Sequence, residues 1–430
     1  MYMKKNYIKY IIFVIPLILI SIFFFIIYKE YKSFLITNQN ISFSTFLTSN
    51  IQKIVNLDIN SDRIINKNIN KNIYIYDKKF SDEGFLLVSG YNDQSKTSLT
   101  TLYSVKEERV LHTWKPPIED IHYHSSDFTN EYNLKKNYRM QHPLLLENGD
   151  LIFSSGEGPL VKIDKCSNHI WSINKHFHHS IELYDKNLII APLVINNKSK
   201  KQFPILDHGF ALVEHNNGNI IKEFSILKIL EDNKKIGLLY GVGEFEYDRV
   251  HLNDAENIKE TDEYFNKGDI MLSSKHLSTV FLYRPSNNKI IWLKTGPWLN
   301  QHDVDYLGNG KFSIFGNDTF RYNQVENYDI FFDINNKIYI YDSKLDKIET
   351  IYNEGMINIK TPTQGLHEIL KNGDIFIENT DNFELIRLSE NNIRWKYYNY
   401  LGNERIGSIH WSRYLDKNTN FDWIESFNCN

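Results

Sequence analysis

The chain has 430 residues, of which 42% are hydrophobic and 14% aromatic. This composition supplies a packed core and excludes a disordered chain. The formal net charge of −4 at pH 7 leaves no basic excess of the kind that binds nucleic acid. With only two cysteines, Cys166 and Cys429, the chain can build neither a cysteine-based zinc site nor a framework of several disulfides. A single bridge stays open, but their wide separation leads us to expect none.

The N-terminus carries an apolar segment, IIFVIPLILISIFFFIIY, at residues 11–28. Its 18 uncharged residues approach the ~20 that span a membrane as a helix. Lys4, Lys5 and Lys9 precede it and favour a cytoplasmic N-terminus. No small-residue cleavage pattern follows, so we expect an uncleaved anchor, and the full chain should fractionate with membranes. The expected order is a short cytoplasmic N-terminus at 1–10, a transmembrane signal anchor at 11–28 and a juxtamembrane spacer at 29–74.

From Gly84 onward the sequence has a β texture that repeats. Each clear copy has an Asn-Gly-Asp or Lys-Gly-Asp turn, two apolar or alternating strands, an Asn-rich hairpin turn and a strand ending in Trp. These copies lie within His142–Trp171, His251–Trp292 and His367–Trp395. We expect the closing tryptophans, Trp171, Trp292 and Trp395, to be core residues.

Weaker copies begin at Gly84, His178 and Gln301, which makes six. Six similar antiparallel units predict an all-β chain with a six-bladed β-propeller over residues 75–430. A pair of β-sandwiches is the alternative, but it does not account for six similar units. Insertions are expected at Asn197–Pro204, Leu227–Arg249 and Thr319–Asp333. Whether the ring closes by exchange between the segment near Tyr74 and the run Ile409–Ile424 stays open.

Five histidines stand just before the first strand of a copy. In a propeller the first strands line the axis, so side chains at their entrances should meet at one mouth of the ring. The five are His142, His179, His251, His302 and His367. Because the ordinary pKa of histidine is ~6.5, such a group can supply a neutral nucleophile, a proton donor and a cation near neutral pH.

Three motifs in this region carry a specific pattern: His251-Leu252-Asn253, Ser273-Ser274-Lys275-His276, and Gln301-His302 leading to Gly316-Asn317-Asp318. The segment carrying them resembles the PAPS-independent arylsulfotransferases, which are six-bladed periplasmic propellers that move a sulfuryl group between phenols. The resemblance implies an aryl sulfate donor, a phenolic or hydroxyl acceptor and no cofactor. It also implies a single-pass protein of a bacterial inner membrane, with its propeller in the periplasm.

The resemblance further implies a ping-pong mechanism through a sulfohistidine. His302 would be the nucleophile, His251 and Asn253 would hold sulfuryl or phenolic oxygens, and His179 would assist proton transfer. Lys275 completes the expected catalytic set. The expected substrate-binding residues are Asn253, His276, Asn317, Trp298 and His367. A loose transition state with charge on the equatorial oxygens suits a neutral nitrogen nucleophile surrounded by cationic or N–H donors.

The chain departs from the family at Lys275, where the family has arginine. Lysine keeps the charge but loses the planar fork that grips two oxygens. Family members also carry a disulfide near the site, which two distant cysteines do not obviously reproduce. Activity could therefore be altered or absent.

Plainer interpretations accompany these residues. His302 could cap a turn, and His179, within His176–His179, could be solvated. Imidazoles could bind zinc, but here they come from different blades and Lys275 would repel a cation, so we expect no metal. The rival function is a membrane-tethered propeller that binds a ligand or protein without turnover. Gathering of His179, His251, Lys275 and His302 within reach of one sulfate would favour the enzyme.

Overall fold

The structure is a computed structural model that describes residues 63–125, 138–195, 205–241, 247–322, 330–332, 336–351, 357, 359, 361–390, 392–424 and 429. The chain divides into two compact units, and the larger comprises Arg63–Phe320 and Phe331–Asn430. The smaller, Met1–Asp62 with Arg321–Ile330, lies almost wholly outside the described residues. The fold below is therefore that of the larger unit.

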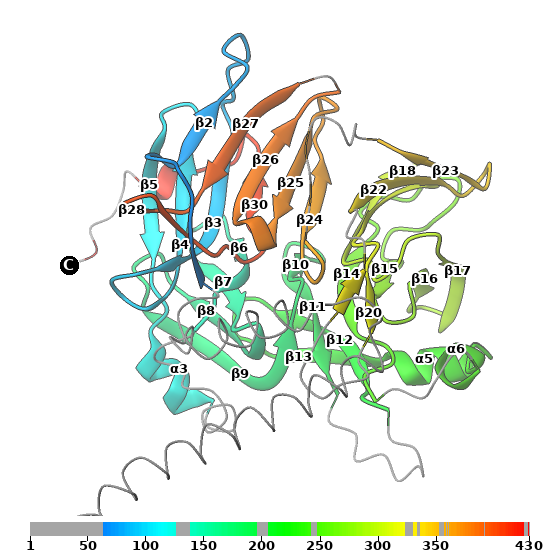
Figure 1. Cartoon of the computed structure of the whole chain (residues 1–430). Coiled ribbons are helices and arrows are strands. Elements are labelled where there is room, and N and C mark those ends of the chain that lie inside the picture. Colours follow the sequence, from blue (N-terminus) through cyan, green and yellow to red (C-terminus); the bar gives the residue numbers. More distant parts are fainter. Residues whose placement is uncertain are drawn as a thin grey trace, which may run out of the picture. The chain divides into compact units, whose positions relative to one another are not determined.

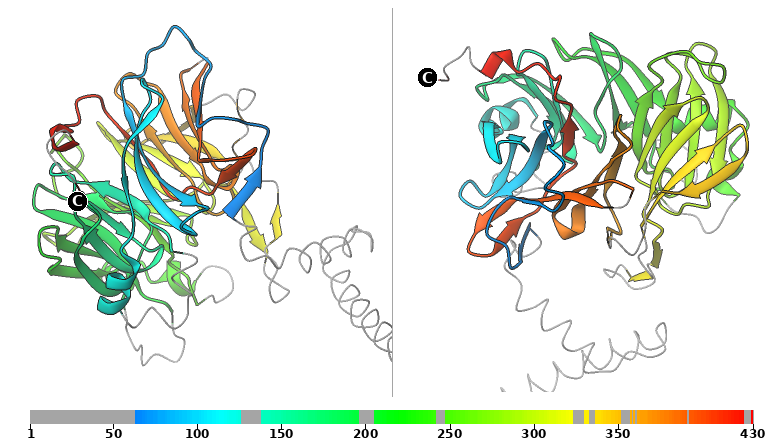
Figure 2. Two further views of the ribbon diagram at one scale, coloured as in Figure 1. Left: turned by 90° about the vertical axis from the view of Figure 1, so that its left-hand side faces the viewer. Right: turned by 90° about the horizontal axis from the view of Figure 1, so that it is seen from above.

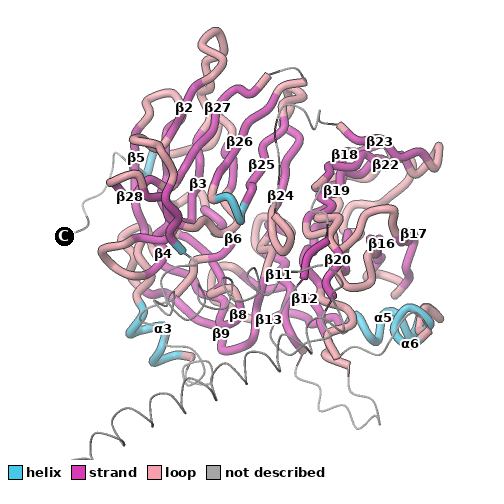
Figure 3. The backbone as a smooth tube through the Cα atoms, in the orientation of Figure 1, coloured by secondary structure: helices cyan, strands magenta, loops and turns pink. Residues whose placement is uncertain are grey.

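Antiparallel strands dominate, and helices are few and short (Figure 3). Within the described residues the strands form six units of four. The first unit takes its first strand from the C-terminal region and contains β30 (Arg413–Leu415), β3 (Phe85–Asn92), β4 (Thr97–Ser104) and β5 (Arg109–Trp114).

The other five units follow in chain order. The second and third contain β6 (Gln141–Leu145), β7 (Leu151–Ser154), β8 (Glu157–Ile163) and β9 (His169–His178), then β10 (Glu182–Leu183), β11 (Leu188–Val194), β12 (His208–Glu214) and β13 (Ile220–Ser225). The fourth contains β14 (Leu252–Asn257), β15 (Ile270–Ser274), β16 (Thr279–Arg284) and β17 (Lys289–Thr295). The fifth and sixth contain β18 (Asp303–Gly308), β19 (Lys311–Gly316), β22 (Lys337–Asp342) and β23 (Lys347–Thr350), then β24 (Leu366–Ile369), β25 (Ile375–Asn379), β26 (Glu384–Leu388) and β27 (Ile393–Tyr398).

The units succeed one another around a common centre, with the first strands β6, β10, β14 and β24 toward it (Figure 1), and Figure 2 shows the same succession from two other sides. Hydrogen bonds link each unit to the next near these first strands. Backbone amides donate to acceptors of the preceding unit: His142 to the carbonyl of His410, Ile181 to Nδ1 of His142, Ala255 to Ser180, Val304 to Asp254, His367 to Asp303, and both Trp411 and Ser412 to Glu378. The links run all the way round, so the all-β, propeller-like architecture expected from the repeats is confirmed.

The repeated turns have one shared mechanism. Gly149, Gly268 and Gly373 adopt φ values of +88°, +86° and +83°, which only glycine adopts without strain. The aspartate that follows each glycine pairs with a basic residue of the third strand. The pairs are Asp150 with Lys162, Asp269 with Arg284, and Asp374 with Arg387. Each turn is therefore tied to the strand two places along in its own unit.

Both ends of the folded unit take part in closing the ring. β30 pairs with β3, so the C-terminal region supplies the first strand of the N-terminal unit. The segment near Tyr74 instead forms β2 (Ile73–Ile75), which pairs with β27 at the outer edge of the sixth unit. A small extra sheet combines β1 (Ile64–Asn66), β29 (Arg405–Gly407) and β28 (Tyr400–Gly402). The open question about closure is thus answered: the C-terminal strand does not pair with the Tyr74 segment.

Connections outside the repeat carry the remaining elements. α3 (Ile118–His124) precedes β6, and α5 (Ile226–Asp232) and α6 (Gly237–Tyr240) occupy the insertion before β14. A two-stranded sheet of β20 (Phe320–Tyr322) and β21 (Ile330–Phe332) comes between β19 and β22 in the sequence. Short 3-10 helices are η3 (Thr380–Asn382) and η4 (Asp422–Ile424). The insertion expected at 197–204 lies outside the described residues.

Apolar side chains of neighbouring units form the core, as the repeat predicted. Trp171 and Trp395 are buried, and half-buried Trp292 stacks on Phe312 with ring centroids 4.7 Å apart. The transmembrane anchor expected at 11–28 lies outside the described residues and stays a prediction. Among the residues that are described, no helix combines the length and the apolar character needed to cross a membrane.

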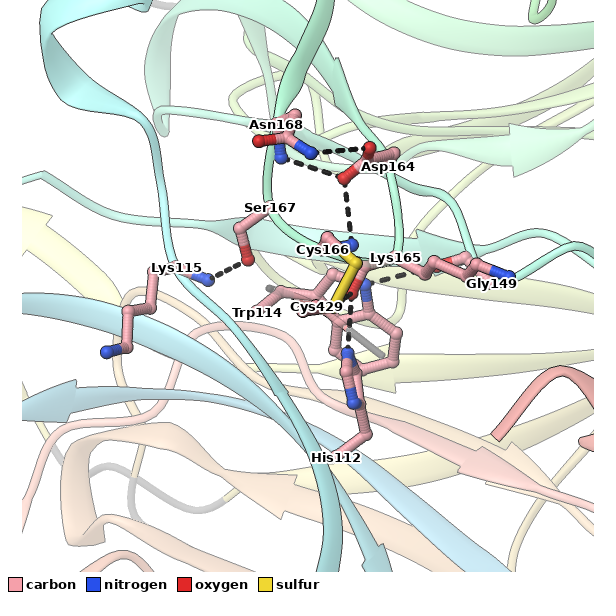
Figure 4. Close-up of a disulfide and its surroundings, with 10 residues drawn as sticks. All are labelled: His112, Trp114, Lys115, Gly149, Asp164, Lys165, Cys166, Ser167, Asn168 and Cys429. Carbon is pink, nitrogen blue, oxygen red and sulfur yellow. Dashed lines mark hydrogen bonds between the residues drawn. A yellow bond between two sulfur atoms is a disulfide. The ribbon is translucent and has the colours of Figure 1, made fainter. Parts of the chain in front are cut away.

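The expectation that the two cysteines stay unpaired was wrong. Cys166, in the turn between β8 and β9, forms a disulfide with Cys429 across a sequence separation of 263 (Figure 4). Ring closure explains the contact, because β30 returns the chain to the first unit, beside the second. Trp423 of η4 then packs against Trp114 of β5, with ring centroids 5.6 Å apart. Separation along the chain was therefore a poor guide to separation in space.

Replacing Cys166 with serine should lower the free energy of unfolding by about 2–4 kcal/mol, because the disulfide restricts the unfolded chain over a long loop. Urea unfolding followed by tryptophan fluorescence measures the change. A reductant should lower the wild-type midpoint and leave that of the variant unchanged. Equal midpoints for the oxidised wild type and the variant would show that the bridge does not contribute to stability.

Candidate active site

Four aromatic residues begin the first strands in an uncommon backbone conformation. His142, His179, His251 and Trp411 have φ values of +46°, +60°, +43° and +55°. Residues other than glycine rarely adopt positive φ, and such strain persists where the surrounding structure holds it, often at functional sites. The same conformation at the entrances of four different units therefore marks this end of the ring as a candidate site.

The rings of these residues gather with His302. The His179 ring centroid lies 5.3 Å from that of His251, 5.9 Å from that of His302 and 5.7 Å from that of Trp411. The Trp411 centroid is 6.3 Å from His302 and 5.2 Å from His142. The structure thus brings together His179, His251 and His302, which the sequence placed in one catalytic set.

The hydrogen bonds of Asn317 determine the tautomer of His302. The Asn317 side-chain nitrogen donates to the carbonyl oxygens of Thr361 and Gln364, each at 2.6 Å. Its oxygen must therefore face His302, whose Nδ1 lies 2.6 Å away and must donate. In a neutral ring the proton on Nδ1 leaves Nε2 with a free lone pair, and Nε2 is buried without a hydrogen-bond partner among the described residues. His302 is therefore held as a neutral imidazole with an unengaged Nε2.

Asp248 holds two further imidazoles. One carboxylate oxygen accepts from Nδ1 of His251 at 2.5 Å, and the other accepts from Nε2 of His208 at 2.8 Å. Burial raises the pKa of Asp248, but the hydrogen bonds from the two histidines outweigh it and hold the pKa below its usual value. The charge on Asp248 fixes His251 with Nε2 as its remaining acceptor.

A line of imidazoles runs from Asp248 to His179. Nδ1 of His208 lies 3.0 Å from Nε2 of His178, and Nδ1 of His178 lies 2.9 Å from Nδ1 of His179. Because Nε2 of His208 donates to Asp248, neutral rings allow one pattern: each ring donates toward Asp248 and accepts on its other nitrogen. The pattern leaves Nε2 of His179 as an acceptor at the far end. We call Asp248, His208, His178 and His179 the histidine relay.

The electrostatic surroundings favour the neutral form of His302, His251 and His179. Burial, followed by the positive charge of Lys275, lowers the pKa of His302 well below 6.5, although the bond to Asn317 acts in the opposite direction. Burial also lowers the pKa of His251 to about 3, against the effect of Asp248. For His179, burial and the neighbouring His178 lower the pKa, and Lys275 contributes in the same sense. Lys275 is itself buried, so one lysine lies close to all three predicted histidines.

The predicted substrate-binding residues fall into two groups. His276 joins the histidines: its ring centroid is 4.5 Å from that of His251, and its Nδ1 donates to the carbonyl of Asp248. Asn253 is fully buried, donates to the carbonyl of Gln301 and has an oxygen without a partner in the described residues. Asn317 uses both ends of its amide to orient His302, and it bonds to Nδ1, on the side of the ring away from Nε2.

Trp298 and His367 make other contacts. Trp298 lies in the core around Val304 and Phe312, and its ring packs against Tyr339, so its predicted role in substrate binding stays a prediction. His367 is turned to Asp303, whose carboxylate accepts from its Nδ1 at 2.7 Å. Because Asp303 follows His302 directly, this bond leaves the expected place of His367 at the same mouth as a prediction. Nδ1 of His142 accepts a hydrogen bond from the Ile181 amide, so this histidine links two neighbouring units.

Sequence reasoning missed Asp248, His208, His178 and Trp411. Asp248 lies in an insertion between repeats, and its position three residues before His251 was the available signal. Trp411 lies two residues before the C-terminal strand β30, and no repeat was recognised there. The side-chain atoms of His208, Asp248 and His251 lie close enough to hold a metal ion. They instead satisfy one another by hydrogen bonds.

Replacing Lys275 with methionine should raise the pKa of His302, because the lost positive charge no longer opposes protonation. A histidine-selective ¹⁵N NMR titration from pH 4 to 8 measures the change. In the wild type His302 should remain neutral at pH 6.5, with its proton on Nδ1. Lys294→Met, which removes a surface lysine paired with Asp346, is the matched control and should leave the titration unchanged. An unchanged His302 in K275M would contradict this electrostatic account.

Comparisons with known proteins agree with the family suggested by the motifs. No curated protein matches the chain. A crystal structure of a protein of unknown function from Bacteroides caccae is 11% identical, covers 77% of this chain and 98% of its own, and has a TM-score of 0.47. A luciferin-regenerating enzyme is 10% identical, with coverages of 60% and 74% and a TM-score of 0.37. The WD40 repeats of RRP9 are 9% identical, with coverages of 59% and 61% and a TM-score of 0.36.

These structural similarities are too low to support an argument about the site. The family comparison is stronger, because the model described as arylsulfotransferase (ASST) matches residues 142–399, more than half of the chain. The match spans the second to sixth units and includes the histidines, Lys275 and Asn317. The chain therefore belongs to the arylsulfotransferase (ASST) family.

Proposed function

We propose that this protein transfers a sulfuryl group from an aryl sulfate to a phenol or another hydroxyl acceptor, through a sulfohistidine on His302 and without PAPS. The observation that carries the proposal is the unengaged Nε2 of His302, held neutral by burial and oriented by Asn317. A nitrogen nucleophile must present a lone pair, and a buried imidazole whose other nitrogen donates presents one permanently.

The surroundings of His302 suit the charge of a sulfuryl group. In a loose transition state negative charge spreads over the three equatorial oxygens, as in phosphoryl transfer. Lys275 supplies a fixed cation whose effect reaches His302, His251 and His179. A buried cation is more effective than an exposed one, because little water screens it.

The reaction would proceed in two half-reactions. In the first, Nε2 of His302 forms a bond to sulfur as the bond from sulfur to the phenolic oxygen breaks, and the departing phenolate takes a proton from the enzyme. In the second, an acceptor hydroxyl loses its proton to the enzyme and its oxygen attacks sulfur, which restores His302. Proton uptake and release balance over the cycle.

His179 is the proposed site of these proton transfers. Its Nε2 is an acceptor when all three rings of the histidine relay are neutral, and it carries a proton when the relay holds one more, with the rings donating in the opposite direction. This extra proton, held in the relay before the donor binds, is the one that the first half-reaction uses, and the acceptor hydroxyl restores it in the second. A proton arriving there can be passed on as each ring gives up the proton on its other nitrogen, until the positive charge is next to Asp248. Return of the proton by the same route would protonate a leaving phenolate.

Trp411 supports an aromatic substrate in place of Trp298. Its ring borders both His302 and His179. An indole at that position offers a flat apolar surface to a phenyl ring. The rival proposal, a tethered propeller that binds without turnover, would use the same residues and differs in having no chemical step.

Replacing His302 with asparagine should reduce sulfuryl transfer by at least about 10³-fold, because the side chain loses the nucleophilic nitrogen. Phenol release from a chromogenic aryl sulfate, and product formed from a phenol acceptor, measure activity. With donor alone the wild type should accumulate an acid-labile sulfohistidine, which mass spectrometry would find missing in the variant. The matched control is His215→Asn, which changes a half-buried histidine that follows β12 in the third unit and should leave activity unchanged.

Two results would contradict this assignment. Undiminished turnover in H302N would remove His302 from the mechanism. Absence of phenol release in the folded wild type, across several donors and acceptors, would favour the binding protein instead.

Replacing His208 with glutamine should interrupt the histidine relay while keeping a side chain that donates and accepts hydrogen bonds. The rate should fall by about 10²-fold for donors whose leaving phenol is strongly basic, and by less for nitrophenyl sulfates, which need little protonation on departure. The dependence of kcat/KM on the leaving-group pKa measures this. If the role of His208 were purely structural, kcat/KM would fall by the same factor for all donors.

A further inference from the structure

A second polar cluster lies on the first strands and begins at Asp254 and Asp303, the residues that follow Asn253 and His302. Inner strands of four consecutive units contribute carboxylates that act on one another electrostatically. We call these the axial carboxylates: Glu182 of β10, Asp254 and Glu256 of β14, Asp303 and Asp305 of β18, and Glu368 of β24. The proposed sulfuryl transfer uses none of them.

The axial carboxylates carry more negative charge than their neighbours balance. Arg413 pairs with Glu182 at 3.0 Å, and Lys259 acts on Glu256. Packed carboxylates of this kind need protons or a bound cation to balance their charge.

His367 points to a cation. Its side chain is fully buried, and its Nδ1 and backbone amide both bond to the same Asp303 oxygen, at 2.7 and 2.8 Å. With the proton on Nδ1, Nε2 carries a lone pair, and Nε2 has no hydrogen-bond partner among the described residues. It lies 3.7 Å from a carboxylate oxygen of Asp305. Two electron-rich atoms at that distance repel each other unless a positive species lies between them.

We propose that Asp305 and Nε2 of His367 bind a divalent cation on the first strands, at a position separate from Nε2 of His302. The 3.7 Å between Nε2 of His367 and the Asp305 oxygen leaves room for one ion bonded to both. Asp303 belongs to the same group of possible ligands, but it bonds to the opposite nitrogen of the ring, so it orients His367 and does not bind the ion. A carboxylate with an imidazole suits Mn²⁺ or Zn²⁺ better than Mg²⁺ or Ca²⁺, which prefer oxygen ligands throughout. Nδ1 of His367 donating to a carboxylate is also the usual support of a metal-bound imidazole.

The argument that Lys275 would repel a metal applies to the active-site histidines and does not extend to these residues. Lys275 acts on His179, His251 and His302, whereas His367 is surrounded by carboxylates. His367 thus occupies the same position at the entrance of a first strand as the active-site histidines, but its neighbours are carboxylates and not Lys275.

Isothermal titration calorimetry tests the site. Protein without a tag is first stripped of metal with a chelator and then titrated separately with MnCl2, ZnCl2, MgCl2 and CaCl2. Mn²⁺ or Zn²⁺ should bind with one-to-one stoichiometry and raise the melting temperature. Asp305→Asn and His367→Gln should each weaken binding at least tenfold. Asp346→Asn, which changes an exposed carboxylate, should bind as the wild type does.

Three results would overturn the proposal. One is the absence of saturable binding. Another is binding that survives D305N and H367Q but is lost in H208Q, which would place the ion at Asp248. The third is an NMR spectrum, recorded at pH 7.5 with Zn²⁺ and without Mn²⁺, in which His367 is protonated on both nitrogens. If the variants fail to fold, anomalous diffraction from wild-type crystals soaked in MnCl2 decides: a peak bonded to Nε2 of His367 supports the site, and its absence refutes it.

Discussion

The inner edges of the sheets impose the constraint on which this structure depends. An antiparallel sheet ends in a strand with unpaired amides, and six such edges meet around one axis, where each needs an acceptor. The protein supplies these acceptors from side chains of the preceding unit, chiefly Asp254, Asp303 and Glu378. Carboxylates near the axis are therefore part of the fold itself. Their accumulation gathers negative charge on the first strands, while His179, His251 and His302 stay neutral because burial and Lys275 oppose their protonation.

Neutral buried imidazoles are useful only if each keeps one tautomer. The protein achieves this with acceptors whose orientation is fixed elsewhere: Asn317 is anchored by two carbonyls, and Asp248 is charged and holds two rings at once. The residues that decide the chemistry are therefore partly residues that never contact a substrate. This explains why Asn317 belongs behind His302, although a motif alone suggested direct binding.

Much of the fold could be predicted because its signals are local. The glycine turns, the alternating strands and the closing tryptophans each depend on a few neighbouring residues, and they repeat. The histidines that we propose as catalytic could also be predicted, since each stands at the entrance of a first strand. The disulfide, Asp248 and Trp411 were not, because their positions depend on ring closure or on an irregular insertion. His367 occupies the same strand position as the others, yet its environment is set by Asp303 and Asp305 on the preceding unit.

The return of the C-terminal region has a consequence for synthesis of the protein. Trp411 and β30 are encoded near the end of the chain, while their neighbours in space are made much earlier. A ribosome-bound chain that has completed five units still lacks the aromatic wall beside His302 and the strand that seals the first sheet. The ring can therefore close only when translation is almost finished, and a premature stop late in the message would remove Trp411 together with the closing strand.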